Sequence, residues 1–552
     1  MRKWMTGCAA VFVLCLFALA AQAQTADVYL AGDMKISVNE PYARDNRAYD
    51  RNLLVPLVEG TESFVYKTTA DVVTYLYTVP VCEDEKTLIY LSLPCDEELT
   101  TAYLNGEPLS VNQPVEIDLT QTAELHTATK TRRALIRLTF SNLPVFSFTL
   151  DGNVTKAEQA AHLCVIDPDY NAHGWDEQKL ECDAMISFRG NSSLNYSEKR
   201  PYNFSLMKDG EKWDQSLAGL RKDSDWLLDS AFNDASRMRN RVCMDVWDDI
   251  CQLPWNYSLS GATEGTYAEL FVNGTYKGLY ALGEKQDRKE LGLKKADSET
   301  QGLIIRSTNT FGENNYSPAG FHSLGTKGPG ADSKLLWYNL EIKFPSAEYI
   351  TDDSWTDMYD LTKLVIKGSK SEFSDEIVQY VNLNNMADYY LFNNAMNLSD
   401  NMRKNLTFVQ YDRNDSRFSA FILVPWDMDA SLGRAYSSGK TDVTDTSSNK
   451  LFNRLINEDV FGFKTLVYER WQELKEGALS LDHIMGYFDR YYQLLSRAGA
   501  LMREEETHPK FKSYLQIGYH FNLDVEKEIG YIRTYMEQHL AYWDEQIESK
   551  MR

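Results

Sequence analysis

The chain has 552 residues, of which 43% are hydrophobic and 25% charged, a composition typical of folded proteins with room for two to four domains. It carries 57 Lys and Arg against 80 Asp and Glu, a formal net charge of -23 at pH 7. Nucleic-acid binding relies on clustered basic side chains, and no long basic run is present, so we expect no nucleic-acid partner. Phosphate chemistry in so acidic a chain requires local cations or a metal ion.

Residues 1–23 have the features of a secretory signal peptide. Arg2 and Lys3 form a basic start, 8–20 is an apolar run, and Ala21-Gln22-Ala23 is a small-x-small cleavage site. We therefore expect a secreted, periplasmic or cell-surface protein. No later segment approaches the ~18 consecutive apolar residues of a membrane-spanning helix, so we expect no transmembrane segment in the mature chain.

Six cysteines follow the predicted signal peptide: Cys82, Cys95, Cys164, Cys182, Cys243 and Cys251. An even number in an exported protein permits three disulfides. The pairings closest in sequence are 82/95, 164/182 and 243/251, among fifteen possible connectivities.

Residues 25–155 read as an accessory β-sandwich domain of immunoglobulin-like type. Short β-branched or aromatic runs are separated by turns such as Asn105-Gly106 and Asp151-Gly152. The predicted strands are 72–79, 87–93, 102–104, 115–119, 135–140 and 145–150. This part contains no convergent set of titratable residues, which favours a spacer or adhesion role.

Residues 160–552 have a mixed α and β pattern. Strands are predicted at 184–189, 202–207, 267–272, 276–282, 406–411 and 418–424, with a hairpin turn at Asn273-Gly274. Helices are predicted at 237–250, 355–378 and 384–398, and residues 451–552 are almost wholly helical in pattern. Two stretches rich in small and polar residues, 311–333 and 430–450, are predicted loops.

The common nucleotide-binding and hydrolase signatures are absent from the sequence. A small-residue turn at 189–193 follows a predicted strand, and Lys199 and Arg200 precede the next one. Backbone amides and hydroxyls of such a turn can contact an anion, with a cation beside it. The alternative is an ordinary hairpin turn.

A second stretch, 400–405, follows an apolar helix. Asp400 can accept or orient a hydroxyl proton, and the amide of Asn405 can ligate a divalent ion. Arg403 and Lys404 lie between them. The alternative is a polar loop capped by Asp400.

A third stretch runs from a buried apolar strand, 421–425, into Asp427-Met428-Asp429. Hard oxygen ligands at a strand end suit Mg²⁺ or Mn²⁺ beside phosphates. The alternative is capping of the following turn. A fourth stretch, the hairpin 267–284, ends at Glu284 and has a purely structural alternative.

The order of these parts is that of a protein-kinase-like fold, in which Asp-x4-Asn precedes a metal-binding Asp. Two other functions remain open. Asp427-Met428-Asp429 is also an Asp-x-Asp motif of metal-dependent glycosyltransferases, although a doubly wound enzyme of that type needs alternating βα units before the motif. A surface adhesin or scaffold could retain the fold without catalysis.

Six stretches together resemble the spore coat protein H (CotH) family of atypical secreted kinases: 189–193, 199–202, 229–241 with Arg239-Asn240-Arg241, 273–280, 400–405 and 426–429. The resemblance covers about residues 160–510. It implies an α+β, kinase-like fold with a small β-rich lobe and a larger helical lobe. It also implies ATP, a divalent metal and phosphorylation of Ser or Thr in exported proteins.

Carried to this sequence, the resemblance implies Asp400 as the catalytic carboxylate and Asn405, Asp427 and Asp429 as metal ligands. The implied nucleotide-binding residues are Arg189, Asn191, Ser192, Ser193, Lys199, Arg200, Glu284 and Lys404. Ser205 stands where many relatives have a basic residue, so either Lys199 or Arg200 could contact the phosphates. Asp245 and Asp248 are equal candidates for the helix carboxylate that pairs with that cation.

Overall fold

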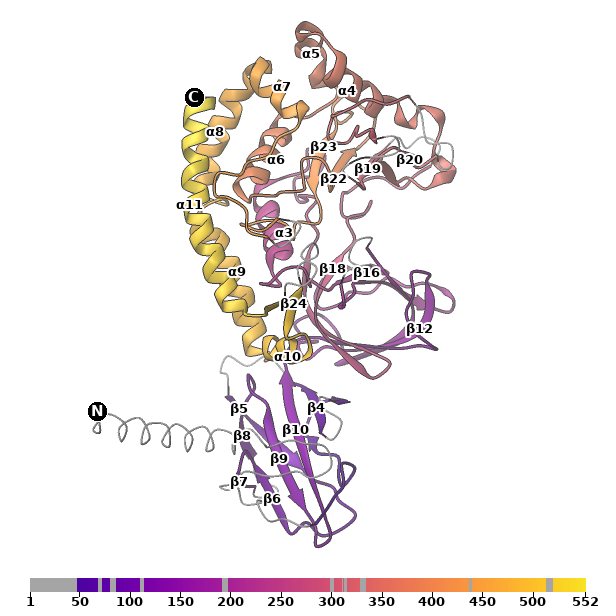
Figure 1. The fold of residues 1–552 in the computed structure, drawn as a ribbon. Helices are drawn as coiled ribbons and strands as arrows, with labels where there is room; N and C mark the ends of the chain where they lie inside the picture. The colour runs from indigo at the N-terminus through magenta and orange to yellow at the C-terminus, as the bar shows by residue number, and fades with distance from the viewer. Residues whose placement is uncertain are drawn as a thin grey trace, which may run out of the picture.

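The computed structural model describes residues 47–552, apart from the short stretches 68–71, 80–85, 110–113, 191–196, 298–301, 310, 312–314, 328–333, 436–438 and 513–519. Three β units follow one another along the long axis of the molecule, and helices lie along one side of the second and third (Figure 1). The predicted signal peptide lies outside the described residues. The mixed α+β class is confirmed. No helix within the described ranges has the length and apolar character needed to cross a membrane.

The first unit is built from two sheets around one core. A seven-stranded sheet has the order β3-β4-β10-β9-β6-β7, with β1 beside β10, and a three-stranded sheet has the order β2-β5-β8. Their apolar residues, such as Ile136 of β10 and Ile89 of β5, belong to one cluster. The bounds are β1 Ala48–Tyr49, β2 Leu57–Val58, β3 Ser63–Lys67, β4 Val73–Thr78, β5 Lys86–Ser92, β6 Thr101–Leu104, β7 Glu107–Pro108, β8 Pro114–Asp118, β9 Ala123–Ala128 and β10 Arg132–Ser141.

The second unit is a closed ring of strands. Its order is β13-β12-β11-β17-β18-β16-β14-β15, and β13 also pairs with β14, which closes a barrel around an apolar interior that includes Phe204 and Trp226. The bounds are β11 Val145–Thr149, β12 Gln159–Ile166, β13 Lys179–Phe188, β14 Tyr202–Lys208, β15 Glu211–Lys212, β16 Asp225–Asp229, β17 Gly265–Val272 and β18 Thr275–Glu284. Sequence placed β11 in the first domain, but it pairs with β12 and β17.

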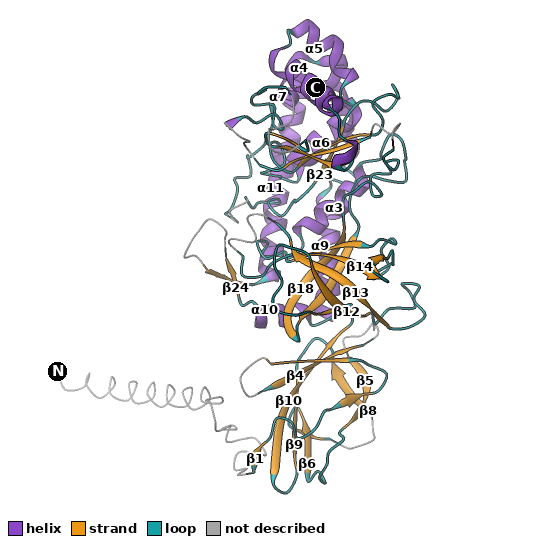
Figure 2. Cartoon of the chain, turned by 90° about the vertical axis from the view of Figure 1, so that its right-hand side faces the viewer, coloured by secondary structure: helices purple, strands orange, loops and turns teal. Residues whose placement is uncertain are grey.

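The third unit is an antiparallel sheet of order β20-β21-β19-β22-β23. Its strands are β19 Leu303–Ser307, β20 Leu336–Trp337, β21 Leu340–Phe344, β22 Leu406–Gln410 and β23 Ile422–Pro425. Apolar residues of the sheet and of the surrounding helices form the largest core of the molecule. Figure 2 shows this sheet and the barrel as separate layers along the molecule.

The helices that share this core are α3 Arg239–Ile250, α4 Thr356–Lys367, α5 Lys370–Glu376, α6 Leu383–Ala395, α7 Lys450–Glu458, α8 Phe463–Lys475, α9 Leu481–Arg497, α10 Ala500–Thr507 and α11 Val525–Met551. The helix predicted at 355–378 is divided into α4 and α5 at Gly368. A side chain there would collide with the carbonyl of Leu364, and Ser369 caps α5 by accepting a hydrogen bond from Glu372 N.

The helix α10 connects the first unit to the barrel. Arg503 donates to Phe140 O at the end of β10 (2.9 Å) and forms a buried pair with Glu269 of β17. Arg137 of β10 reaches Glu506 at 2.7 Å. The ring of Phe64 also stacks on Phe271, with centroids 5.0 Å apart.

Two of the predicted disulfides are wrong. Cys164 lies opposite Glu181 and Cys182 lies opposite Leu163, so these thiols point to opposite faces of the sheet. Cys243 and Cys251 are two turns apart along α3, about 12 Å, which is too far for a disulfide. Every cysteine in the described residues is a free thiol. Cys82 lies outside them, so the pairing with Cys95 stays a prediction.

Candidate functional site

A cleft of about 1100 Å³ lies between the barrel and the antiparallel sheet. Its barrel side comes from the ends of β13 and β16 and the loop 230–234, and its other side comes from β19, residues 399–405, residues 426–429 and residues 446–448. Several of the sequence-predicted residues therefore meet in one place: Arg189, Asp400, Lys404, Asn405, Asp427 and Asp429 all line it.

The register of β22 and β23 brings Asn405 and Asp427 together. Leu406 pairs with Pro425, so the residue before β22 lies beside the residues after β23, and Asn405 Nδ2 donates to Asp427 O at 3.2 Å. Both residues have left-handed backbone, with φ of 59° and 57°. Such conformations are strained for residues other than glycine and are concentrated at functional sites.

Three carboxylates from both sides of the cleft interact: Asp229 at the end of β16, and Asp427 and Asp429 after β23. Asp427 is exposed at the cleft surface, yet enclosure by the protein raises its pKa; Lys404 opposes this shift and Asp229 adds to it. Burial, followed by repulsion from Asp427, raises the pKa of Asp429 well above its usual value. A cation held among them would relieve this repulsion.

Asp400 is held by the lysine four residues later. Lys404 Nζ lies 3.1 Å from Asp400 Oδ2. Burial works against the charged amine, but the carboxylates of Asp400 and Asp427 raise the pKa of Lys404 above its usual value. The ion pair orients the Asp400 carboxylate within the cleft.

Two arginines stack on one tryptophan in the cleft. The guanidinium of Arg306, from β19, lies 4.2 Å from the ring centroid of Trp426, and that of Arg189 lies 5.7 Å from it. Burial, followed by repulsion from Arg189, lowers the pKa of Arg306 to about 10. Arg306 donates to the side chains of Gln286 (2.7 Å) and Thr407 (3.0 Å). In the described residues neither arginine has an ion pair, so the positive charge is available to an anion.

Lys199 lies elsewhere. It is 2% exposed, its Nζ donates to Glu504 of α10 at 2.8 Å and to the carbonyl of Leu279, and it does not line the cleft. Glu504 also accepts from Arg237 Nε at 3.0 Å. Against the effect of burial, these two cations hold the pKa of Glu504 at about 2, whereas burial lowers that of Lys199 to about 8. The prediction that Lys199 contacts the phosphates is thus not supported by its position.

The helix carboxylate that pairs with Lys199 is Glu504, not Asp245 or Asp248. Asp245 binds Arg241 at 2.9 Å and Asp248 accepts from Ser260 at 2.5 Å. Sequence spacing gave no signal for Glu504, because it lies 305 residues after Lys199.

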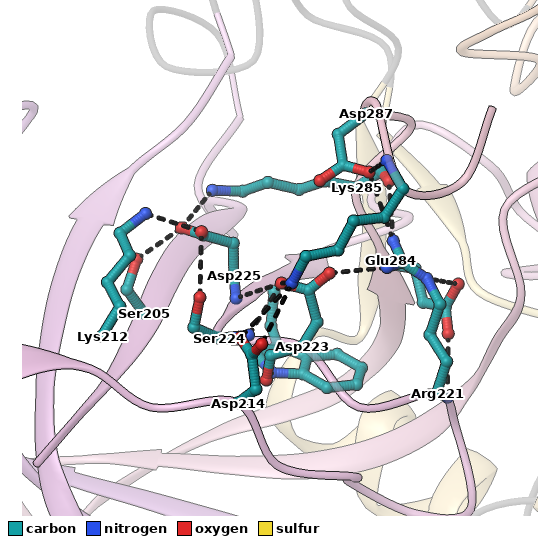
Figure 3. Close-up of polar contacts among 12 residues, drawn as sticks. Ser205, Lys212, Asp214, Arg221, Asp223, Ser224, Asp225, Glu284, Lys285 and Asp287 are labelled. Atoms are coloured by element: carbon teal, nitrogen blue, oxygen red, sulfur yellow. Dashed lines mark hydrogen bonds and ion pairs between the residues drawn. The ribbon is translucent and has the colours of Figure 1, made fainter. Parts of the chain in front are cut away.

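Arg200 and Glu284 also differ from expectation. Arg200 is exposed and lies over the ring of Phe188 at 4.9 Å, outside the cleft-lining residues. Glu284 lines a recess of about 60 Å³ that shares Asp229 and Asp427 with the cleft. Its carboxylate is buried against Arg221, which donates from N and Nε (Figure 3). The predicted Asn191, Ser192 and Ser193 lie outside the described residues.

Two cleft residues received no role from the sequence: Arg306, and Asp229 at the start of the stretch 229–241. Arg306 is a single cation inside the apolar strand β19, a signal that could have marked it. Asp229 ends β16, lines both cavities and accepts from Asn240 Nδ2 at 3.3 Å. Asn240 in turn accepts from Met428 N at 2.9 Å, which ties the start of α3 to the Asp-x-Asp segment.

The donor set suits a hard divalent cation that shares its coordination with phosphate. Among the described residues, no three His, Cys, Asp or Glu side chains form a metal site by themselves. Mg²⁺ typically takes one or two carboxylates and completes its shell with substrate phosphates and water. Asn405, Asp427 and Asp429 offer two carboxylates and an amide beside the two arginines, which fits that pattern.

One comparison with known proteins gives a match. The family model described as CotH kinase protein matches residues 186–543, which include every described residue of the cleft. A search of curated proteins found no match.

Proposed function

Because this chain belongs to the CotH kinase protein family, we propose that it is a secreted protein kinase. It transfers the γ-phosphate of ATP to Ser or Thr of exported or surface proteins, with Mg²⁺ or Mn²⁺. The observation that carries the proposal is that Asp400, Asn405 and Asp427 all line one cleft. They follow one another along the chain in the same order as the catalytic Asp, the Asn and the metal-binding Asp of protein kinases. Its extracytoplasmic location rests on the predicted signal peptide, residues 1–23.

In this proposal the barrel is the small lobe and the helical part with the antiparallel sheet is the large lobe, with ATP between them. The first unit, predicted from sequence as residues 25–155, is an accessory module. Arg306 and Arg189 take the phosphate-binding role that sequence gave to Lys199, because they line the cleft and lack ion pairs among the described residues. The recess at Glu284 is the inner, adenine end.

Asp400 accepts the proton of the substrate hydroxyl, and Lys404 orients it. Asn405, Asp427 and Asp429 would hold the metal ion. When bound, the ion supplies positive charge that offsets the triphosphate in an acidic protein.

Incubation of the purified protein with labelled ATP, Mn²⁺ and casein, or proteins secreted by the producing cell, tests the function. We expect transfer of label that is lost in Asp427→Ala and kept in Asp176→Ala, which removes an exposed carboxylate that does not line the cleft. Absence of both phosphate transfer and ATP binding in the unmodified protein would refute the kinase proposal.

The glycosyltransferase alternative fits less well. The strand before Asp427 belongs to an antiparallel sheet, whereas a doubly wound enzyme needs parallel βα units there. Thermal stabilisation by ATP with Mn²⁺, and not by UDP-sugars, is the expected result. A pure scaffold would respond to neither.

A further inference from the structure

Residues 445–449 are bound to the stretch of chain that carries the proposed catalytic carboxylate, Asp400. Ser447 Oγ donates to Leu398 O at 3.3 Å, and Asn449 Nδ2 donates to Met402 O at 3.1 Å. Leu398 and Met402 stand two residues before and two residues after Asp400. Residues 445–449 are therefore attached on both sides of Asp400.

Further hydrogen bonds fix the start of this segment. Asn397 Nδ2 donates to Asp445 O at 2.9 Å, and Ser447 N donates to the side chain of Asn394 at 2.8 Å. Both partners belong to the end of α6 and the turn that leads to Asp400. The backbone on either side of Thr446 is thus held in place.

Thr446 has a hydroxyl that is free to react. The residue is exposed and lines the cleft together with Asp400. Its neighbours are committed, since Ser447 Oγ donates to Leu398 O and Ser448 Oγ donates to Asn453 at 2.8 Å. For Thr446 Oγ1 no hydrogen bond to another described residue is recorded. If the cleft phosphorylates hydroxyl groups, as the proposed function requires, the hydroxyl of Thr446 is itself a candidate substrate in that cleft.

We propose that Thr446 is phosphorylated by the active site of its own chain, an inference that rests on the proposed kinase function. Thr446 Oγ1 forms a bond to the γ-phosphorus of ATP, and the bond from that phosphorus to the β,γ-bridging oxygen breaks. ADP leaves with the electron pair of that bond. The hydroxyl proton passes to the carboxylate of Asp400 and from there to water.

Two cations line the same cleft as Thr446 and can meet the charge of the product. Arg403 and Lys404 line the same cleft as Thr446, and Arg403 is exposed with no ion pair among the described residues. A phosphothreonine carries about -1.5 to -2 charge and forms strong charge-assisted hydrogen bonds with such cations. The modification thus adds a contact between 445–449 and the stretch that carries Asp400.

Mass spectrometry of the full-length protein after incubation with ATP and Mn²⁺ tests the proposal. Trypsin releases residues 441–450 as one peptide, because Lys440 and Lys450 bound it. We expect phosphate on Thr446, kept as phosphoserine in Thr446→Ser, lost from this peptide in Thr446→Ala, and retained in Thr444→Ala. Thr444 is the matched control, since its hydroxyl donates to Asp442 and it does not line the cleft.

The reaction is intramolecular, so the fraction labelled per unit time stays constant over a hundredfold range of protein concentration. Phosphate on Thr444 or Ser448 instead, or a labelled fraction that rises with concentration, overturns the inference. Labelled casein with an unlabelled Thr446 also overturns it while leaving the kinase function intact. If neither casein nor the chain is labelled and ATP does not bind, the proposed function itself has failed.

Discussion

At the scale of single residues, the site is marked by two arginines that have no ion pair among the described residues. Arg306 and Arg189 share the ring of Trp426, and the carboxylates of Glu341 and Asp427 partly offset the repulsion of Arg306 by Arg189. Asp427 and Asp429, which repel one another, lie on the same side of the cleft as Arg306. Positive and negative charges thus line a common space, which suits the metal-bound polyphosphate of the proposed function.

Replacing Arg306 tests its role in phosphate binding. We expect Arg306→Ala to weaken binding of ATP with Mn²⁺ by about tenfold or more, since hydrogen bonds to charged groups contribute about 1.5–3 kcal/mol. Arg306→Lys should recover only part of the affinity, because a lysine lacks the planar stacking on Trp426. Isothermal titration calorimetry measures the affinity of each variant for ATP with Mn²⁺. Arg200→Ala is the control, an exposed arginine stacked on Phe188, and an equal loss there would contradict the assignment.

A second residue-scale prediction concerns Glu290, which shares Arg221 with Glu284. Burial, followed by its hydrogen bond with Glu284, raises the pKa of Glu290 to about 9. The folded state therefore keeps a proton that the unfolded state releases near pH 4.3. The raised pKa therefore lowers the free energy of unfolding, and it does so by a growing amount as the pH rises from about 4.3 to about 9.

Glu290→Gln removes that cost, so the melting temperature of the variant should rise relative to the unmodified protein between pH 5 and pH 8. Differential scanning calorimetry at both pH values gives the comparison. Glu177→Gln, at an exposed position, should show no such trend. A constant difference at both pH values would show that Glu290 is ionised in the folded protein.

At the scale of elements, the packing of α10 against the barrel depends on one glycine of β18. Gly278 of β18 has φ of +93°, and a side chain there would overlap Glu504 and approach the ring of His508 at 3.2 Å. Glu504 cannot move aside, because it is bound by Lys199, Arg237 and Leu279 N. The space beside Gly278, where another residue would have its side chain, is therefore occupied by Glu504 of α10.

Gly278→Ala should destabilise the protein by about 3 kcal/mol or more, because it adds displacement of a buried ion pair to the cost of left-handed backbone. Gly274→Ala is the matched control. Its φ is +68° with open space around it, so only the backbone cost of about 1 kcal/mol applies. Urea denaturation measures both variants, and equal losses would show that α10 is not seated at Gly278.

Local patterns predicted many of these elements, and long-range pairing explains the errors. The strands β4, β14, β17 and β18 and the helix α3 were located because alternation or helical spacing is a local signal. Membership of β11 in the barrel depends on pairing with β17, more than a hundred residues later. The order of the motifs located the cleft residues 400–405 and 427–429. The role of Arg306 became visible only in the fold, which places it against Trp426.

At the scale of the whole molecule, α10 joins three parts through two adjacent residues. Arg503 reaches Phe140 of the first unit and Glu269 of the barrel. Glu504 reaches Lys199 and, through Arg237, the loop beside the cleft, because Arg237 Nη1 donates to the carbonyls of Ala231, Phe232 and Asp234. The first unit, the barrel and the wall of the cleft are therefore mechanically linked.

Glu504→Gln tests this link. Removing the one carboxylate leaves Lys199 and Arg237 buried without an opposing charge, which typically costs about 3–5 kcal/mol. We expect that loss in urea denaturation, with weaker ATP binding because the loop 231–234 loses its support. Glu505→Gln changes an exposed neighbour and should alter stability by less than about 0.5 kcal/mol. Similar behaviour of the two variants would refute the link.

The distance along the chain between Lys199 and Glu504 has a consequence for synthesis. The ribosome completes the barrel and the Asp-x-Asp segment well before it reaches α10, which lies 305 residues after Lys199. Until then Lys199 and Arg237 have no carboxylate, and the loop beside the cleft is unsupported. The loop beside the cleft therefore gains its support last, and unfinished or prematurely terminated chains lack the ion pairs that hold it.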